Sequence, residues 1–314
     1  LFALVQQWKA RGMAVITITH RMEEIFRTAD IVTVLRNGQW INTVAIQDTD
    51  ARAIVRMMIE DSITPENNRI ARSSEHHTER LRVANLRGGR VQDVSFTLHD
   101  GELLGIGGLH GQGQEDLLLA LFGALPHSGT VTLGGQTTHF KHPRDAMRHA
   151  VAYVPGDRAR DGLLLIRSIL ENFQLPSWER YGALIQRGKA RADAQNAAQE
   201  LQLVYDTLDA SVNSLSGGNA QKVVIGKWLL RQPKLLLLND PTKGVDVNAK
   251  SEFYELLAQL QAGGASILLY SSDDEELIGL CNRVLVMYDG RVRAELTGDK
   301  LNLASLVAAS LDTG

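Results

Sequence analysis

Short continuous apolar runs, each followed by a polar segment, recur along the chain and predict buried strands. They stand at residues 103–106, 151–154, 235–238 and 266–270. Continuous rather than alternating apolar residues are typical of parallel strands that are covered on both faces. Residues 91–98 alternate instead, which predicts a strand of a more peripheral sheet. We therefore predict an α/β fold with a mostly parallel core sheet flanked by helices, an antiparallel β region near 81–100 and a helical insert near 165–230.

The pattern also repeats. Residues 1–38 match residues 253–290 at an offset of 252 without a gap, pairing for example Leu4 with Leu256. Each copy predicts a helix, a buried strand (AVITIT at 14–19 in the first), an acidic helix start, a further strand and a hairpin at Asn-Gly or Asp-Gly. A repeat this long indicates duplicated domains rather than a solenoid. We therefore expect most of the first domain to lie before Leu1, outside this chain.

Between the copies, residues 61–80 are polar and nearly free of large apolar side chains, which is typical of a linker. His76 and His77 lie there, but a metal site needs more converging ligands than this pair, so we interpret them as solvated. The linker divides the chain into residues 1–60 and residues 81–314.

Composition narrows the classes of function. The chain has 314 residues and a net charge of −3, so no overall basic field favours nucleic acid. Its one cysteine, Cys281, excludes an internal disulfide framework and is compatible with a reducing compartment. No apolar run approaches the roughly 20 residues of a membrane-spanning helix. We expect a protein that can dock on a membrane component without crossing the bilayer.

A glycine-rich loop, GGLHGQGQED at 107–116, stands between an apolar strand and a helix. Its glycines are Gly108, Gly111 and Gly113. This is the outline of a phosphate-cradling loop, but that motif continues with Lys and then Ser or Thr. Gln114 and Glu115 stand in those places.

Four further features follow in order, each weak by itself. They are a strand running into a charged loop at 150–162; Ser216, Gly217 and Gly218 before an amphipathic helix; a buried strand ending in Asn239 and Asp240 before a turn with Asp246; and a buried strand ending in Ser271 and Ser272. A helix start with free N–H groups binds phosphate well. Together with the glycine loop, this order is uncommon among unrelated proteins.

The order resembles the ATP-binding cassette pattern. Through LSGGN-QK, PTKGVDV and VPGDR-ARDG, the whole chain resembles the ATP-binding subunit of a bacterial monosaccharide importer of the ribose, galactose or xylose type. That family fuses two nucleotide-binding domains, which pair head to tail around two ATP molecules with Mg²⁺. The resemblance implies that residues 1–60 are the C-terminal part of the first domain and 81–314 the second. It departs at Gly156, where the family usually has Glu.

By this resemblance, the second domain's own site is degenerate. Gln114 replaces the phosphate-binding Lys, and Glu115 replaces the hydroxyl that binds Mg²⁺. Glu115 could touch the ion, but it adds negative charge beside the polyphosphate. Asn239 replaces the acid that holds Mg²⁺ indirectly, Asp240 replaces the general-base Glu, and Ser272 replaces the switch His. We predict poor or no ATP hydrolysis there; the alternative is a divergent but working ATPase site.

The other site retains the parts that lie in this chain. His20 matches Ser272 in the repeat and takes the place of the family's switch histidine, which contacts the γ-phosphate. The second domain's signature motif would complete this site across the interface; its residues are Ser216, Gly217, Gly218 and Asn219. Asp246 is the D-loop residue. The loop that pushes on the permease would contain Val154, Gly156, Asp157 and Arg158.

The resemblance implies ATP hydrolysis that drives sugar import at the cytoplasmic face of a bacterial inner membrane. Its partners would be integral permease subunits and, indirectly, a periplasmic sugar-binding protein, with no nucleic acid. Two alternatives stay open. One is a non-catalytic partner or regulatory fragment, because the chain holds no complete ATP site. The other is a cassette ATPase not tied to transport, which the GVDV turn disfavours.

Overall fold

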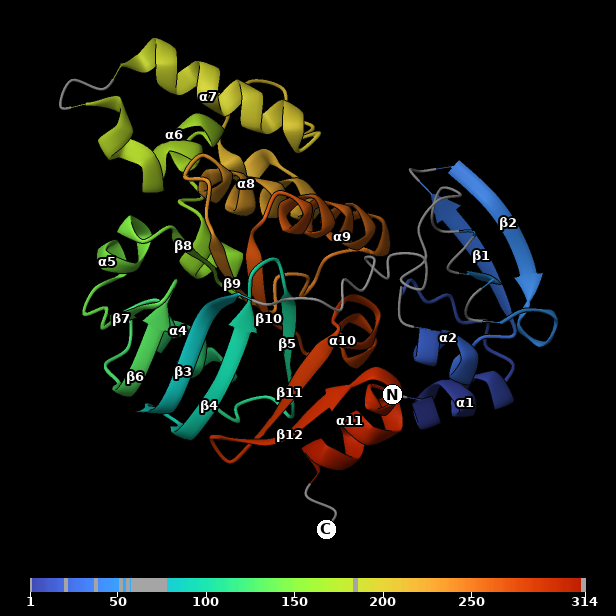
Figure 1. The fold of residues 1–314 in the computed structure, drawn as a ribbon. Helices are drawn as coiled ribbons and strands as arrows, with labels where there is room; N and C mark the ends of the chain where they lie inside the picture. Colours follow the sequence, from blue (N-terminus) through green and yellow to red (C-terminus); the bar gives the residue numbers. More distant parts are fainter. Residues whose placement is uncertain are drawn as a thin grey trace. The chain divides into compact units, whose positions relative to one another are not determined.

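The computed structural model describes residues 2–19, 22–36, 39–50, 53–54, 57, 78–182 and 186–311. The chain forms two compact units (Figure 1). The first contains residues 1–67 and 246–252, and the second contains residues 68–245 and 253–314. In the part of the chain that is described, no helix is both long and apolar enough to cross a bilayer.

A ten-stranded sheet, in the order β7-β6-β3-β4-β12-β11-β5-β10-β9-β8, organises the second unit. Its strands are β3 (Glu79–Gly88), β4 (Val91–His99), β5 (Leu103–Gly107), β6 (Ser128–Leu133), β7 (Gln136–Thr138), β8 (Val151–Val154), β9 (Leu235–Asn239), β10 (Ser266–Tyr270), β11 (Arg283–Tyr288) and β12 (Arg291–Thr297). Strands β8, β9, β10, β5 and β11 run parallel, whereas β3 pairs antiparallel with β4 and β6. The predicted parallel core and antiparallel region are confirmed.

The core explains why the apolar runs are continuous. Every residue of β5, β9 and β10 is buried. Burying one Leu or Ile side chain contributes roughly 1.5–3 kcal/mol, so the four consecutive leucines of β9 strongly favour this central position. The polar residues that follow these strands therefore emerge together at one edge of a rigid sheet.

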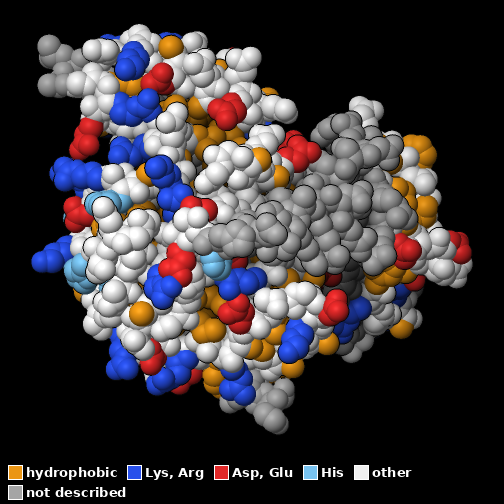
Figure 2. All heavy atoms as spheres, in the orientation of Figure 1, with side chains coloured by type: hydrophobic (Ala, Val, Ile, Leu, Met, Phe, Trp, Pro, Cys, Tyr) orange, Lys and Arg blue, Asp and Glu red, His pale blue; other side chains and the backbone are white. Residues whose placement is uncertain are grey.

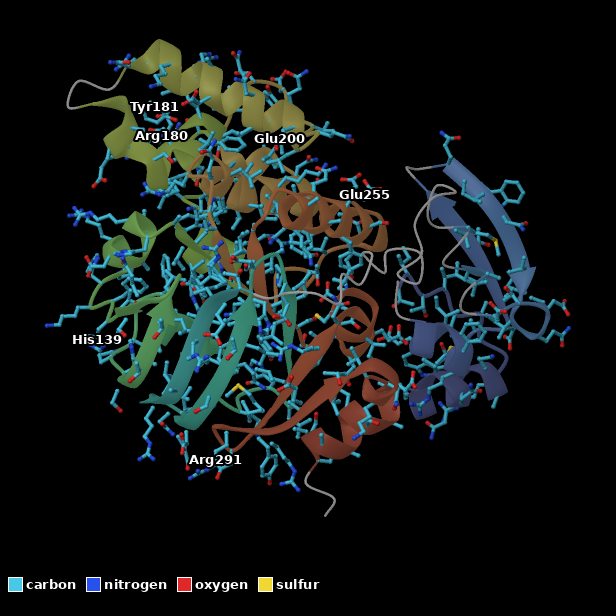
Figure 3. All side chains as sticks on the ribbon, viewed as in Figure 1. His139, Arg180, Tyr181, Glu200, Glu255 and Arg291 are labelled. Atoms are coloured by element: carbon cyan, nitrogen blue, oxygen red, sulfur yellow. The ribbon has the colours of Figure 1, made fainter. Side chains whose placement is uncertain are left out.

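Helices cover the sheet and form a separate insertion between β8 and β9. From β5 onward they are α4 (Gln114–Leu121), α5 (Pro143–Arg148), α6 (Ile169–Gln174), α7 (Arg187–Glu200), α8 (Gly217–Leu229), α9 (Val247–Ala262), α10 (Asp274–Leu280) and α11 (Leu303–Ser310), with short helical turns η2 (Arg158–Gly162), η3 (Leu175–Tyr181), η4 (Val212–Ser214) and η5 (Gly298–Lys300). The insertion contains α6, α7 and α8, which confirms the predicted helical insert. Figure 3 labels Tyr181 and Glu200 on it, and Figure 2 shows basic and acidic side chains interspersed over its surface.

The first unit contains α1 (Phe2–Ala10), α2 (Met22–Thr28), β1 (Ile31–Arg36), β2 (Gln39–Ala45) and η1 (Ile46–Asp48). Adding 252 to the bounds of α2, β1, β2 and η1 gives the bounds of α10, β11, β12 and η5. Even the irregularity in strand pairing recurs, between Val34 and Leu35 in one copy and between Val286 and Met287 in the other. The repeat in sequence is therefore a repeat in structure.

One predicted element is wrong. Residues 13–19 form no regular secondary structure, and the side chains of Ile16 and Ile18 are 94% and 98% exposed. The matching strand of the second copy, β10, bonds to β5 on one side and β9 on the other. A parallel strand makes its hydrogen bonds only with neighbours. The described residues of the first unit contain no strand that pairs with 13–19, so this apolar pattern stays unpaired.

Candidate functional site

The glycine loop between β5 and α4 has the turn of a phosphate cradle. Gly108, Gly111 and Gly113 have φ of 114°, 84° and 103°, in the region that favours glycine. A Cβ on Gly108 would lie 2.3 Å from the carbonyl oxygen of Met287, so no larger residue fits. Arg90 also holds the loop, because its Nη1 donates to the carbonyl of Gly111 at 2.9 Å.

Gln114 does not face a ligand in the way a Lys at this position would. Its side chain is buried, and its Nε2 donates to the carbonyl oxygen of Leu109 at 2.9 Å. The amide therefore closes the loop on itself. The neutral amide of Gln114 does not supply the positive charge that the Lys of the motif provides.

Glu115 and Asn239, both departures from the motif, are partners. Asn239 Nδ2 lies 3.2 Å from Glu115 Oε1 and 3.1 Å from the hydroxyl of Tyr153, and donates to both. Burial raises the pKa of Tyr153 to about 12, so the phenol stays protonated. The described residues include no cluster of three or more His, Cys, Asp or Glu side chains able to hold a metal. The pair places one carboxylate, at the start of α4, beside the amide at the end of β9.

Asp240 and Ser272 form a second pair. The Ser272 amide donates to Asp240 Oδ1 at 3.0 Å, and its hydroxyl lies 3.1 Å and 2.9 Å from the two carboxylate oxygens. Asp240 is 5% exposed and has φ of 46°. A general base needs a carboxylate oxygen that is open to the attacking water. Here hydrogen bonds within the protein engage both oxygens.

A cavity of about 450 Å³ remains beside these pairs. Its described lining includes three cations, Arg90, Arg160 and Lys243, and four carboxylates, Glu115, Asp116, Asp157 and Asp240. A triphosphate needs an excess of positive charge, and helix α4 begins with its own acids, Glu115 and Asp116, where an anion would bind. The cavity is therefore poorly suited to Mg-ATP.

The signature segment is built differently. Ser216 caps α8, and its hydroxyl accepts from the amide of Asn219 at 3.4 Å and from Asn219 Nδ2 at 3.0 Å. Asn219 Oδ1 in turn accepts from the amide of Val204 at 2.9 Å. Ser216 and Gly217 are exposed at the start of a helix of 13 residues. This geometry leaves an exposed N-terminus that favours negative charge.

The loop after β8 is fastened to this helix. Arg158 Nη1 donates to the carbonyl of Lys243 at 3.2 Å, and its Nη2 lies 3.0 Å from where a Cβ on Gly217 would be. At the other end of η2, the ammonium of Lys227 donates to the carbonyl of Gly162. Burial lowers the pKa of Lys227 to about 8. Sequence reasoning missed Lys227, although a lone Lys on an apolar helix face was a usable signal.

The other predicted residues of this loop lie close to the end of β9 or at the start of η2. Val154 is buried at the end of β8. A Cβ on Gly156 would lie 3.1 Å from the carbonyl oxygen of Asn239, so the loop packs closely on the end of β9. Asp157 caps η2 by accepting from the amides of Ala159 and Arg160.

The remaining predicted residues fall elsewhere. Asp246 Oδ1 accepts from the amide of Ala249 at 3.0 Å, at the start of α9. His20 and the linker histidines, His76 and His77, lie outside the described residues. Beside His20, the hydroxyl of Thr19 donates to Glu24 Oε2 at 2.7 Å. Sequence reasoning did not single out this contact, although the repeat matches Thr19 and Glu24 with Ser271 and Glu276.

Comparison with known proteins gives consistent results. The model of the ABC transporter family matches residues 91–243. The chain is 40% identical to the ribose import ATP-binding protein RbsA 1 of Rhizobium etli, over 100% of this chain and 62% of that protein. It is 39% identical to the ribose import ATP-binding protein RbsA of Geobacillus kaustophilus, over 99% of this chain and 63% of that protein. The chain thus spans less than two thirds of these relatives.

Solved structures agree on the fold. A nucleotide-free ATP-binding cassette from an ABC transporter superposes with a TM-score of 0.64 at 21% identity, over 71% of this chain and 93% of that one. The ADP conformation of the cassette MJ1267 gives a TM-score of 0.61 at 20% identity, over 75% and 96% of the two chains. The second unit thus has the ATP-binding cassette fold, as the sequence predicts.

Proposed function

We propose that the chain is part of the ATP-binding subunit of a monosaccharide importer, because the model of the ABC transporter family matches residues 91–243. The similarity to two ribose import ATP-binding proteins, over nearly the whole of this chain, supports a sugar of that class. The subunit hydrolyses ATP and couples the energy to transport. It acts at the cytoplasmic face of the membrane, bound to integral permease subunits and only indirectly to a periplasmic sugar-binding protein.

The two paired domains form two ATP sites, and only one of them hydrolyses ATP. The single observation that carries this proposal is the pairing of the replaced residues, Glu115 with Asn239 and Asp240 with Ser272. Since these side chains are hydrogen-bonded to one another instead of being free for a ligand or water, the second domain's own site does not hydrolyse ATP. Its residues do not fit Mg-ATP, and no catalytic step passes through them.

The other site uses what this chain retains. The domains pair head to tail, so that the exposed start of α8, with Ser216 and Gly217, meets the γ-phosphate held by the first domain. Its N–H groups and helix dipole stabilise the negative charge of the transferring phosphoryl group. His20 orients the attacking water, and the D-loop residue Asp246 lies at the same interface. ATP, when bound, supplies the phosphoryl group, and Mg²⁺ neutralises its phosphates.

The loop from Val154 to Arg158 passes the closing motion to the permease. This role is supported by the hydrogen bond of Arg158 to the turn at Lys243 and by the proximity of Arg158 to the start of α8 at Gly217. A displacement of the loop therefore moves the signature segment with it.

ATP turnover by the full-length subunit tests the assignment of the sites. Ser216→Ala and His20→Ala should each lower turnover by tenfold or more, whereas Asp240→Ala should leave it within twofold of the unmodified protein. Asp240→Ala is the matched control, because it alters the strand end of the degenerate site. The opposite pattern, with loss of turnover only in Asp240→Ala, would show that the second domain's site is the working one.

A further inference from the structure

A buried carboxylate holds the end of β10 in the second copy. Glu276, on α10, is 3% exposed. The hydroxyl of Ser271 donates to it, and the hydroxyl of Thr242, in the turn after β9, lies 2.9 Å and 3.0 Å from its two oxygens. Glu276 therefore ties the ends of two neighbouring strands to one helix.

This contact fixes the residue at the switch position. Ser271 immediately precedes Ser272, and its hydroxyl also accepts from the amide of Asp273 at 3.0 Å. Asp273 in turn caps α10 at the amide of Glu276. With both flanking residues held, Ser272 points its hydroxyl at Asp240, 2.9 Å away.

The first copy contains the same hydroxyl–carboxylate contact. At the offset of 252, Ser271 corresponds to Thr19 and Glu276 to Glu24. Thr19 Oγ1 donates to Glu24 Oε2 at 2.7 Å, from the end of the segment 13–19 to helix α2. The contact is present although 13–19 forms no strand, so strand pairing is not what brings the two side chains together.

The residues around the contact have diverged between the copies. The switch position is Ser272 in one copy and His20 in the other, and the residue matching Tyr254 on α9 is Phe2. The hydroxyl and the carboxylate are nevertheless retained, with Ser exchanged for Thr. The two copies thus share the hydroxyl before the switch position and the carboxylate after it, but they differ at the switch position itself.

We propose that Thr19 and Glu24 are positioning residues for His20 in ATP hydrolysis. This inference rests on the proposed function, in which His20 acts at the site held by the first domain. The carboxylate fixes the hydroxyl of Thr19, and thereby the end of the described segment immediately before His20 in sequence. A misplacement of about 1 Å in a group that orients the attacking water can cost about 100-fold in rate. The contact therefore acts on the chemical step more than on ATP binding.

The test measures kcat and KM for ATP in the full-length subunit. Thr19→Val removes the donor at nearly constant shape, and Glu24→Ala removes the acceptor. Each should lower kcat by tenfold or more and change KM by less than twofold, and Thr19→Ser should restore kcat. Ser271→Ala is the matched control in the second copy and should leave kcat within twofold.

His20→Ala separates this inference from the proposed function. If His20→Ala keeps full turnover, the proposed role of His20 is wrong. If it abolishes turnover while Thr19→Val keeps normal kcat, the site assignment stands and only the positioning role is overturned. An equal loss of kcat in Ser271→Ala and Thr19→Val would also overturn it, because the contact would then serve folding in both copies.

Discussion

Asn239→Asp alone should destabilise the second domain, whereas the same change combined with Glu115→Thr should not. In the unmodified protein, Asn239 Nδ2 donates to Glu115 Oε1 at 3.2 Å. Two carboxylates at that separation repel by about 5 kcal/mol at an effective dielectric constant of about 20. Because Glu115 is exposed, rotation and solvent screening should reduce the measured cost to about 1–2 kcal/mol. With Thr at 115, the new Asp gains a hydroxyl donor instead.

Urea unfolding of four proteins measures this coupling: the unmodified chain, each single variant and the double variant. Midpoints at low and high salt, followed by tryptophan fluorescence, give the free energies. The double variant should be more stable than the sum of the single effects by at least 1 kcal/mol, and high salt should shrink that difference. Effects that add within about 0.4 kcal/mol would refute the pairing as the reason for these two replacements.

Three predictions follow from other contacts. Adding Gln114→Lys to the double variant supplies a charged phosphate contact worth about 1.5–3 kcal/mol, so affinity for a fluorescent Mg-ATP analogue should rise at least tenfold; unchanged affinity would contradict this. Burial lowers the pKa of Lys227 to about 8 from 10.5. Between these values the unfolded chain binds the proton and the folded one does not, so stability rises with pH; relative to Lys227→Met, the gain between pH 7 and 9.5 should be about 2 kcal/mol, and parallel pH curves would count against it. Gly226→Ala should destabilise by about 2 kcal/mol in urea, because its Cβ would lie 2.3 Å from Phe173; Gly188→Ala, with nothing within 4 Å, should be neutral or better, and equal effects would exclude a packing cause.

The buried strands of the second unit were predictable because burial on both faces leaves a continuous apolar run in the sequence. Residues 14–19 carry the same mark but form no strand. Local sequence records that a segment is suited to a sheet, whereas the strand itself depends on distant neighbours, as β10 depends on β5 and β9. Residues 14–19 were misjudged because the described residues of the first unit contain no strand that pairs with them.

The candidate site, too, could be predicted from the sequence only in part. Motif spacing was enough to single out Gln114, Glu115, Asn239, Asp240 and Ser272 as replacements. It could not reveal that they pair, because Glu115 and Asn239 are 124 residues apart in sequence. The contact at Glu24 could more nearly have been predicted, because the repeat aligns its two residues with Ser271 and Glu276. Sequence alignment alone does not show that the side chains meet; the hydrogen bond does.

The pairing of the replaced residues also affects whether they can mutate back to the family's residues one at a time. A single change to the family's residue, such as Asn239→Asp or Ser272→His, removes a hydrogen-bond partner from the neighbouring side chain. Each such change lowers the stability of the protein unless the partner residue changes with it, so a return to the family's residues requires paired mutations. If, as we propose, this site does not hydrolyse ATP, the two hydrogen-bonded pairs hinder the recovery of hydrolysis through single mutations.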